Sequence, residues 1–275
     1  MAGRHERTVL TTGANSGFGL ATAVHLARLG FRSVGSVRSE KKATEVAETA
    51  ARAGVAVDTV LLDVTDAESC AAVMEDLRPW GVVNNAGYSG MGAIEDTTDE
   101  EARRQLETMV IAPMRLARLA LPHMRAEGGG RVVNISSIYG LTTTPFSGWY
   151  QACKHALEAA SDALRLEVAR DGVKVVLIEP GGFKTEIWND LEEDVARHAG
   201  SNYEVGYQRT RTLLKAYSGF MGEPEDAAKA IGKALTARSA RARYLVGADA
   251  LAIAVTQPLI PTRIRDRITR LVTGL

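Results

Sequence analysis

Short, valine-rich apolar segments alternate with longer amphipathic segments along nearly the whole chain. Apolar segments with little polar alternation are typical of strands covered on both faces, and the longer segments have the length of crossover helices. The alternation therefore predicts an α/β fold with a doubly wound parallel sheet. Seven segments are expected to be its strands: residues 8–13, 32–37, 57–63, 80–85, 131–136, 173–180 and 242–247.

The chain has 275 residues, which is enough for one large α/β domain with a substantial core. We see no internal repeat, low-complexity tract or linker, so residues 1–275 are expected to form a single domain. Residues 186–222 exceed a plain crossover in length, are rich in aromatic residues and follow a predicted strand. Ligands of open α/β sheets bind outside the carboxyl ends of the strands, so this segment is interpreted as a substrate lid. Residues 249–275 are expected to form a C-terminal helical extension.

Composition excludes several other classes of protein. Lys plus Arg equals Asp plus Glu at 33 each, so no overall field favours nucleic acid. Cys70 and Cys153 lie far apart and match no metal-ligand spacing, so no metal is expected, and two thiols suit a reducing compartment. Residues 1–7 are too short and polar for a secretory signal, and no run of 18 apolar residues suggests a membrane span. We expect a cytoplasmic protein.

A glycine-rich turn, TGANSGFG, joins the first predicted strand to the first predicted helix. Gly13 permits a tight turn, Gly17 lets the backbone approach a pyrophosphate, and Gly19 lets the helix pack closely. The helix N-terminus then offers free N–H groups and a partial positive charge to the phosphates. The spacing is GxxxGxG and not GxGxxG, so the dinucleotide site is indicated by its place between strand and helix as much as by the glycines.

The end of the second predicted strand indicates which dinucleotide is bound. An acidic residue there usually binds the ribose 2′-hydroxyl of NAD, whereas an arginine accommodates the 2′-phosphate of NADP. Here Val37 is followed by Arg38, and the first carboxylate, Glu40, comes later. A solvated basic helix start would give the same residues, but the pattern favours NADP, with NAD as the other possibility.

The segment that follows the fifth predicted strand contains a serine, a tyrosine and a lysine that suit proton transfer to or from an alcohol or ketone. Tyr150 and Lys154 are four apart on a predicted helix and therefore share one face. A cation about 4 Å away favours the phenolate by roughly 4 kcal/mol at an effective dielectric near 20. Before desolvation is subtracted, Lys154 and a positively charged nicotinamide are therefore expected to lower the pKa of Tyr150. Ser137, at the strand end, is expected to hydrogen-bond the same substrate oxygen. Tyr-x-x-x-Lys alone is usually an exposed helix pair.

Together these motifs resemble the short-chain dehydrogenase/reductase family, over residues 7 to about 247. The matching motifs are TGANSGFG, LDVTD, VNNAG, ISSIYG with YQACK, and EPGGFKT. The resemblance implies a Rossmann-type, seven-stranded fold and catalysis by Ser137, Tyr150 and Lys154. It implies contacts of Asp63 and Val64 with adenine, of Lys154 with the nicotinamide ribose and of Thr185 with the carboxamide. The cofactor-binding residues that it implies are Gly13, Asn15, Ser16, Gly17, Phe18, Gly19, Arg38, Asp63, Val64, Asn85, Ala86, Gly87, Tyr150, Lys154, Pro180, Gly181, Phe183 and Thr185.

Two positions depart from the family pattern. Many relatives have an Asn thirteen residues before the Pro of an LPxM stretch, where it is thought to hold a water in a proton relay. Counting back from Pro122 places Met109 there, and a thioether cannot replace that amide. Cys153 stands where Ser is commoner, which is interpreted as a packing substitution. The relay is therefore the part of the mechanism that the resemblance does not carry over.

LRPWGVVNNAG, SVR and EPGGFKT look similar to the hydroxysteroid and retinol dehydrogenase branch, whose substrates are bulky apolar alcohols or ketones. By this resemblance Ser137, Tyr139 and Tyr150 contact the substrate. Two rivals are a ketoreductase for a carrier-bound acyl chain and a non-catalytic regulator that senses NADP. Some aromatic and methionine residues are expected either to line an apolar pocket or to belong to the core: Tyr88, Met91, Tyr139, Phe146, Trp149, Trp188, Tyr203, Tyr207, Tyr217 and Phe220.

The C-terminal sequence IPTRIRDRITRLV has an apolar stripe at helical spacing and four arginines largely elsewhere. Such a helix either lies on a membrane surface or packs on its own domain or on a partner subunit. We favour packing and expect a homodimer or homotetramer.

Overall fold

The computed structural model describes residues 7–184 and 191–275. Its seven strands form one parallel sheet in the order β3-β2-β1-β4-β5-β6-β7. All seven predicted strands are confirmed, with ends shifted by one or two residues at most. Their bounds are β1 Thr8–Thr11, β2 Arg32–Val37, β3 Asp58–Leu61, β4 Gly81–Asn84, β5 Gly130–Ile135, β6 Val173–Pro180 and β7 Arg243–Val246.

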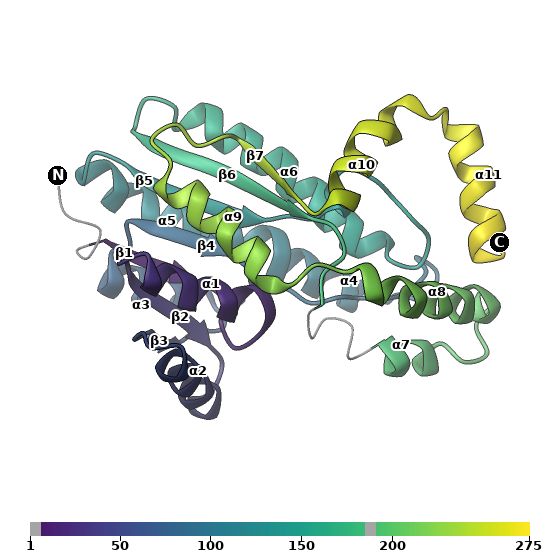
Figure 1. Cartoon of the computed structure of the whole chain (residues 1–275), viewed down its shortest axis with the longest axis horizontal. Helices are drawn as coiled ribbons and strands as arrows, with labels where there is room; N and C mark the ends of the chain where they lie inside the picture. The colour runs from purple at the N-terminus through teal and green to yellow at the C-terminus, as the bar shows by residue number, and fades with distance from the viewer. Residues whose placement is uncertain (1–6, 185–190) are drawn as a thin grey trace.

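Helices cover both faces of the sheet, as the uninterrupted apolar strands require (Figure 1). One face packs on α1 (Gly17–Arg28), α2 (Glu40–Arg52) and α9 (Pro224–Thr236). The other packs on α3 (Ala67–Leu77), α5 (Ala112–Ala126) and the end of α6 (Gly148–Glu167). α4 (Asp99–Leu106) continues into α5 through a π-helical segment, Glu107–Ile111.

β1 lies between β2 and β4, so the strand order reverses beside it. At such a switch point the loops that follow neighbouring strands diverge and leave a crevice at their carboxyl ends. The glycine turn after β1 and the VNNAG turn after β4 therefore lie side by side, which places both motifs at one end of the sheet.

Two helical segments extend beyond this core at the same end of the sheet (Figure 1). The described part of the predicted lid contains α7 (Leu191–Arg197) and α8 (Glu204–Tyr217). The C-terminal arm, residues 248–273, contains α10 (Ala248–Thr256) and α11 (Thr262–Thr273), and α11 returns to contact α8. No helix among the described residues is long and apolar enough to cross a membrane.

Candidate active site

The glycine turn has the backbone that its sequence predicts. Gly13 and Gly17 have φ of +63° and +50°, values that residues with a Cβ rarely adopt. A Cβ on Gly19 would lie 2.1 Å from the carbonyl oxygen of Gly13, so only glycine allows this close packing. Within the described residues, no side chain caps the N-terminus of α1, and its first turn has no acidic residue. The turn is therefore shaped to receive an anion such as a pyrophosphate.

VNNAG fixes the glycine turn in place. The side-chain amide of Asn85 donates hydrogen bonds to the carbonyl oxygens of Thr12 (2.9 Å) and Gly13 (3.1 Å). The backbone N–H groups of Asn85 and Ala86 both donate to the hydroxyl of Thr12, each at 2.9 Å. These bonds hold the two turns close together. They explain why the small residues Ala86 and Gly87 follow Asn85, since bulkier side chains would separate the two turns.

The adenosine end of the crevice brings two predicted residues together. Arg38 is exposed directly after β2, and Asp63 follows β3, the strand beside it. Asp63 accepts hydrogen bonds from the backbone N–H and hydroxyl of Thr65 at 2.9 and 2.7 Å. These bonds lower the pKa of Asp63, and the Arg38 charge lowers it further. Val64 is buried next to Asp63.

The other predicted cofactor residues lie nearer the sheet centre. Phe18 and Phe183 meet edge-to-face with ring centroids 5.2 Å apart, which joins the glycine turn to the loop after β6. Pro180 ends β6, and Gly181 with Phe183 borders the same cavity as Phe18. The side-chain amide of Asn15 lies 3.5 Å from the Ser16 hydroxyl. Gly87 lies next to Met109, which a Cβ on Gly87 would contact. Thr185 lies outside the described residues.

Ser137, Tyr150 and Lys154 converge at the carboxyl end of β5. The Lys154 ammonium donates a hydrogen bond to the carbonyl oxygen of Ile135 (2.8 Å) and lies 5.4 Å from the centre of the Tyr150 ring. The Ser137 oxygen accepts from the backbone N–H of Tyr139 at 3.1 Å. Ser137 lowers the pKa of Tyr150, and both side chains line one cavity, so the two residues share one local site.

The pKa values at this site differ from the prediction. Burial raises the pKa of Tyr150 to about 12, although the hydrogen bond with Ser137 opposes the rise. Burial also lowers the pKa of Lys154 to about 8. In this structure the effect of burial on the pKa of Tyr150 therefore exceeds the interactions that favour its phenolate. The expectation of a lowered tyrosine pKa counted the charges of Lys154 and a bound nicotinamide before the opposing effect of burial was subtracted.

Ser137, Tyr139 and Tyr150 line a cavity of about 450 Å³. Of the aromatic and methionine residues considered for a pocket, Met91 and Tyr217 also line it. Tyr207 instead packs with Phe146 in a buried cluster under the lid, and Phe220 is exposed. Tyr203 packs against that cluster, Tyr88 borders a neighbouring cavity, Trp149 is half-buried and Trp188 lies outside the described residues.

The sequence prediction missed the C-terminal arm as part of this cavity. Ile253, Gln257 and Ile260 line it from α10 and the turn that follows. Asp249, at the start of α10, accepts hydrogen bonds from the Gly182 N–H at 2.6 Å and the Tyr217 hydroxyl at 2.7 Å. It therefore ties the arm, the lid and the loop after β6 together. No motif in the sequence pointed to Asp249, because its two partners are 32 and 67 residues away.

Met109 lies in the π-helical segment and is almost fully buried. A Cβ on Gly87 would be 3.5 Å from both Cγ and Sδ of Met109, so this side chain fills the space beneath the VNNAG turn. Its role here is packing, which is consistent with its apolar chemistry.

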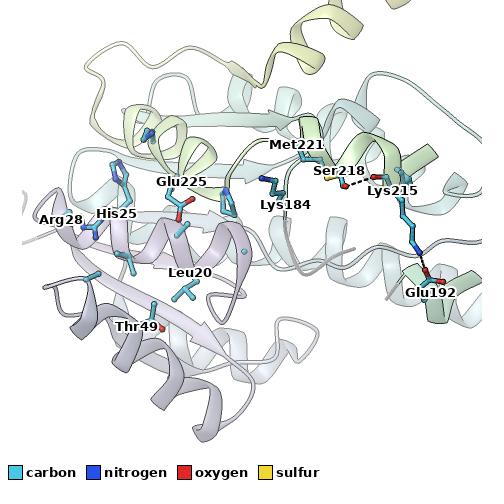
Figure 2. Close-up of a pocket in the computed structure, with 18 residues that line it drawn as sticks. Leu20, His25, Arg28, Thr49, Lys184, Glu192, Lys215, Ser218, Met221 and Glu225 are labelled. Atoms are coloured by element: carbon cyan, nitrogen blue, oxygen red, sulfur yellow. Dashed lines mark hydrogen bonds and ion pairs between the residues drawn. The ribbon is translucent and has the colours of Figure 1, made fainter. Parts of the chain in front are cut away.

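A second cavity, of about 840 Å³, lies between α1, α2, α8 and α9 (Figure 2). It reaches Gly17 at the start of α1 and shares Leu214 with the smaller cavity, but Ser137 and Tyr150 line only the smaller one. Lys215 pairs with Glu192 on this wall, and the Ser218 hydroxyl donates to the Lys215 carbonyl oxygen at 2.7 Å. The candidate catalytic residues therefore border the smaller cavity.

A family model described as short chain dehydrogenase matches residues 7–196. The "Uncharacterized oxidoreductase YusZ" of Bacillus subtilis is 35% identical over 252 residues, 88% of this chain and 90% of that protein. "17-beta-hydroxysteroid dehydrogenase type 6" of Rattus norvegicus is 32% identical over 285 residues, 95% and 87% of the two chains. The crystal structure of a single-residue variant of actinorhodin polyketide ketoreductase with NADPH has a TM-score of 0.75 at 29% identity, covering 90% and 97%.

Proposed function

Because the chain belongs to the short-chain dehydrogenase family, we propose that it uses NADP(H) to interconvert a bulky apolar secondary or allylic alcohol and its carbonyl compound. One observation carries the proposal: Ser137 and Tyr150 line the cavity, and Lys154 is buried directly behind the tyrosine ring. A hydroxyl pair beside a buried cation is the arrangement that carbonyl reduction needs.

The residues divide the work of that reaction. Ser137 and Tyr150 donate hydrogen bonds to the carbonyl oxygen, which holds the substrate and stabilises the negative charge that develops there. The cofactor, when bound, supplies the hydride to the carbonyl carbon. Tyr150 then gives its proton to the oxygen, and the alcohol results; oxidation reverses each transfer. Lys154 stabilises the phenolate left behind, which matters because burial alone disfavours that anion.

The preference for NADP(H) rests on the end of β2. Val37 is apolar where an NAD enzyme has a carboxylate, and exposed Arg38 follows it. The guanidinium group suits a phosphate because its N–H groups form paired, charge-assisted bonds. The actinorhodin ketoreductase structure that this chain resembles was solved with NADPH, in agreement with that choice.

The apolar substrate rests on the walls of the cavity. Met91, Ile138, Leu214, Ile253 and Ile260 contribute apolar side chains around the hydroxyls of Ser137 and Tyr150. Serine, threonine and charged residues such as Asp194 and Arg265 also border the cavity, but most of its exposed wall is apolar, and such a wall binds apolar ligands and orients them through a few hydrogen bonds. The similarity to a hydroxysteroid dehydrogenase of rat points to the same class of substrate.

A turnover screen tests the proposal. The full chain is incubated with NADPH or NADH and with steroid ketones, retinal or short keto-esters, and cofactor oxidation is followed. We expect turnover of an apolar ketone with NADPH. Turnover of short keto-esters alone would favour a ketoreductase for carrier-bound acyl chains. Tight NADPH binding with no turnover of any carbonyl compound would favour a regulator and overturn the proposal.

A further inference from the structure

Helix α11 packs on the protein through its polar face. Thr273 is 8% exposed, and Arg265 and Thr269, one and two turns earlier, are half-buried. Residues four apart lie on one side of a helix, so these three form the contact face toward α8 and the cavity. The sequence analysis favoured packing of the apolar stripe on its own domain or on a partner subunit; the first of these is wrong, and the second stays a prediction.

The apolar stripe of α11 faces away from the protein. Ile264 and Ile268 are each 53% exposed, Leu271 is 71% exposed and Val272 is 49% exposed. Single exposed apolar residues are ordinary, but four on one helix face form a contiguous patch that usually marks an interaction surface. Leu259, in the turn before α11, is 77% exposed and adds to it. Exposure of this apolar surface to water is therefore unfavourable.

The charges beside the stripe indicate what covers it. Arg263, Arg267 and Arg270 flank one side of the stripe, and Asp266 is the one acidic residue of α11. A twofold contact between two copies of this helix would bring like charges together, which disfavours a second copy of the chain. An apolar stripe edged by arginines suits an anionic lipid surface, where the stripe enters the acyl region and the guanidinium groups reach the phosphates.

The inner side of the same arm lines the cavity through Ile253, Gln257 and Ile260. The apolar surface on the outer side of the arm is thus separated from the substrate cavity by a single layer of helix. We propose that the apolar stripe of α11 (Ile264, Ile268, Leu271 and Val272) docks on an anionic lipid bilayer. The cavity then opens beside the phase in which an apolar alcohol or ketone is dissolved. This docking is independent of the proposed reaction and is measured without substrate.

Flotation with lipid vesicles tests the docking. The full chain is mixed with phosphatidylcholine vesicles that contain or lack phosphatidylglycerol, and the bound fraction is measured. We expect binding to the anionic vesicles and little binding to the neutral ones. Ile268→Ser/Leu271→Ser should abolish binding, whereas Leu166→Ser, which alters an equally exposed leucine on α6, should leave it unchanged. Unchanged NADPH binding and thermal unfolding show that each variant is folded.

Charge variants separate the electrostatic part. Each basic group near an anionic surface contributes about 1 kcal/mol, so Arg263→Gln/Arg267→Gln/Arg270→Gln should weaken binding about a hundredfold. Arg118→Gln/Arg170→Gln/Lys174→Gln removes the same charge from other exposed positions and should have little effect. The proposal would be overturned by wild type that does not float with anionic vesicles, or by stripe variants that float as wild type does. Conversion of a dimer to a monomer by the stripe substitutions without vesicle binding, or binding of an acidic carrier protein in place of vesicles, would also overturn it.

Discussion

The Lys154 ammonium donates its hydrogen bond to the carbonyl oxygen of Ile135, the last residue of β5, across 2.8 Å. This bond holds a buried cation at the end of a central strand, 5.4 Å from the ring centre of Tyr150. The cost of burial appears in the pKa of Lys154, which falls from its ordinary 10.5 to about 8. The position of the cation is thus set by the backbone and not by a carboxylate partner.

Lys154→Met should reveal this cost as a pH-dependent gain in stability. The native protein binds the lysine proton less tightly than the unfolded chain, so the contribution of Lys154 to stability is greatest above pH 10.5 and falls as pH drops through 8. The free energy of unfolding of the variant should therefore exceed that of wild type by more at about pH 7 than at about pH 10. This excess should change by up to ~3 kcal/mol between the two pH values. Urea unfolding at both pH values measures it.

Lys41→Met is the matched control, because Lys41 is exposed on α2. Its difference from wild type should be the same at both pH values. An equally flat difference for Lys154→Met would show that the pKa of Lys154 is not lowered in the folded protein.

Arg38→Ala should weaken NADPH binding and leave NADH binding nearly unchanged. Charge-assisted hydrogen bonds contribute about 1.5–3 kcal/mol, so the dissociation constant for NADPH should rise by about ten- to a hundredfold. Calorimetric titration with both cofactors measures the change. Lys41→Ala, a further exposed basic residue near that strand end, serves as the control. Equal constants of wild-type protein for NADPH and NADH would remove Arg38 from cofactor choice.

Tyr217→Phe should raise KM for an apolar ketone about tenfold and change kcat little. The substitution keeps the ring but removes the 2.7 Å hydrogen bond to Asp249 that joins the lid to the C-terminal arm. Loss of a hydrogen bond to a charged group costs about 1.5–3 kcal/mol, and here the cost falls on closure of the cavity. Tyr203→Phe, which removes a surface hydrogen bond to Glu95, should leave both constants unchanged. Identical kinetics for the two variants would show that the link to Asp249 does not hold the lid.

Met109→Asn should raise kcat and leave KM roughly unchanged. An amide at this position offers hydrogen bonds for a water beneath the VNNAG turn, whereas the present side chain offers only packing. Proton-transfer steps contribute about 10²–10⁴-fold, so a missing relay group slows the reaction without stopping it. Rates in H₂O and D₂O across pH measure the effect. Met109→Leu, which keeps an apolar side chain, should behave as wild type. The same kcat and solvent isotope effect in the Asn variant would show that no relay passes this position.

The grouping of the candidate catalytic residues could be predicted because parallel strands bring their carboxyl ends to one edge of the sheet. Ser137 follows β5, the glycine turn follows β1 and VNNAG follows β4, so strand assignment alone groups them. The spacing of Tyr150 and Lys154, which are one helical turn apart, then predicted that they lie on the same face of their helix. The effect of burial on the pKa of Tyr150 could not be predicted from the sequence, because burial depends on contacts that distant segments make.

The orientation of the C-terminal arm could not be predicted for the same reason. The apolar spacing of Ile264, Ile268 and Leu271 correctly indicated an amphipathic helix. A repeat of apolar residues does not determine which face of the helix packs against the protein. Here the polar face, which includes Thr273, packs inward. Likewise Asp249 has no local partner, so its link to Gly182 and Tyr217 arises only from the folded arrangement.

The most direct test of the central claim is the turnover of an apolar ketone with NADPH by Tyr150→Phe, measured alongside NADPH binding. The account predicts a fall in kcat of about 10²–10⁴-fold or more, because the phenylalanine ring keeps the packing but has no proton to give. NADPH should still bind within about twofold of wild type. Tyr139→Phe, which alters the neighbouring ring of the same cavity, should retain most of the activity. Turnover by Tyr150→Phe close to that of wild type would contradict the account.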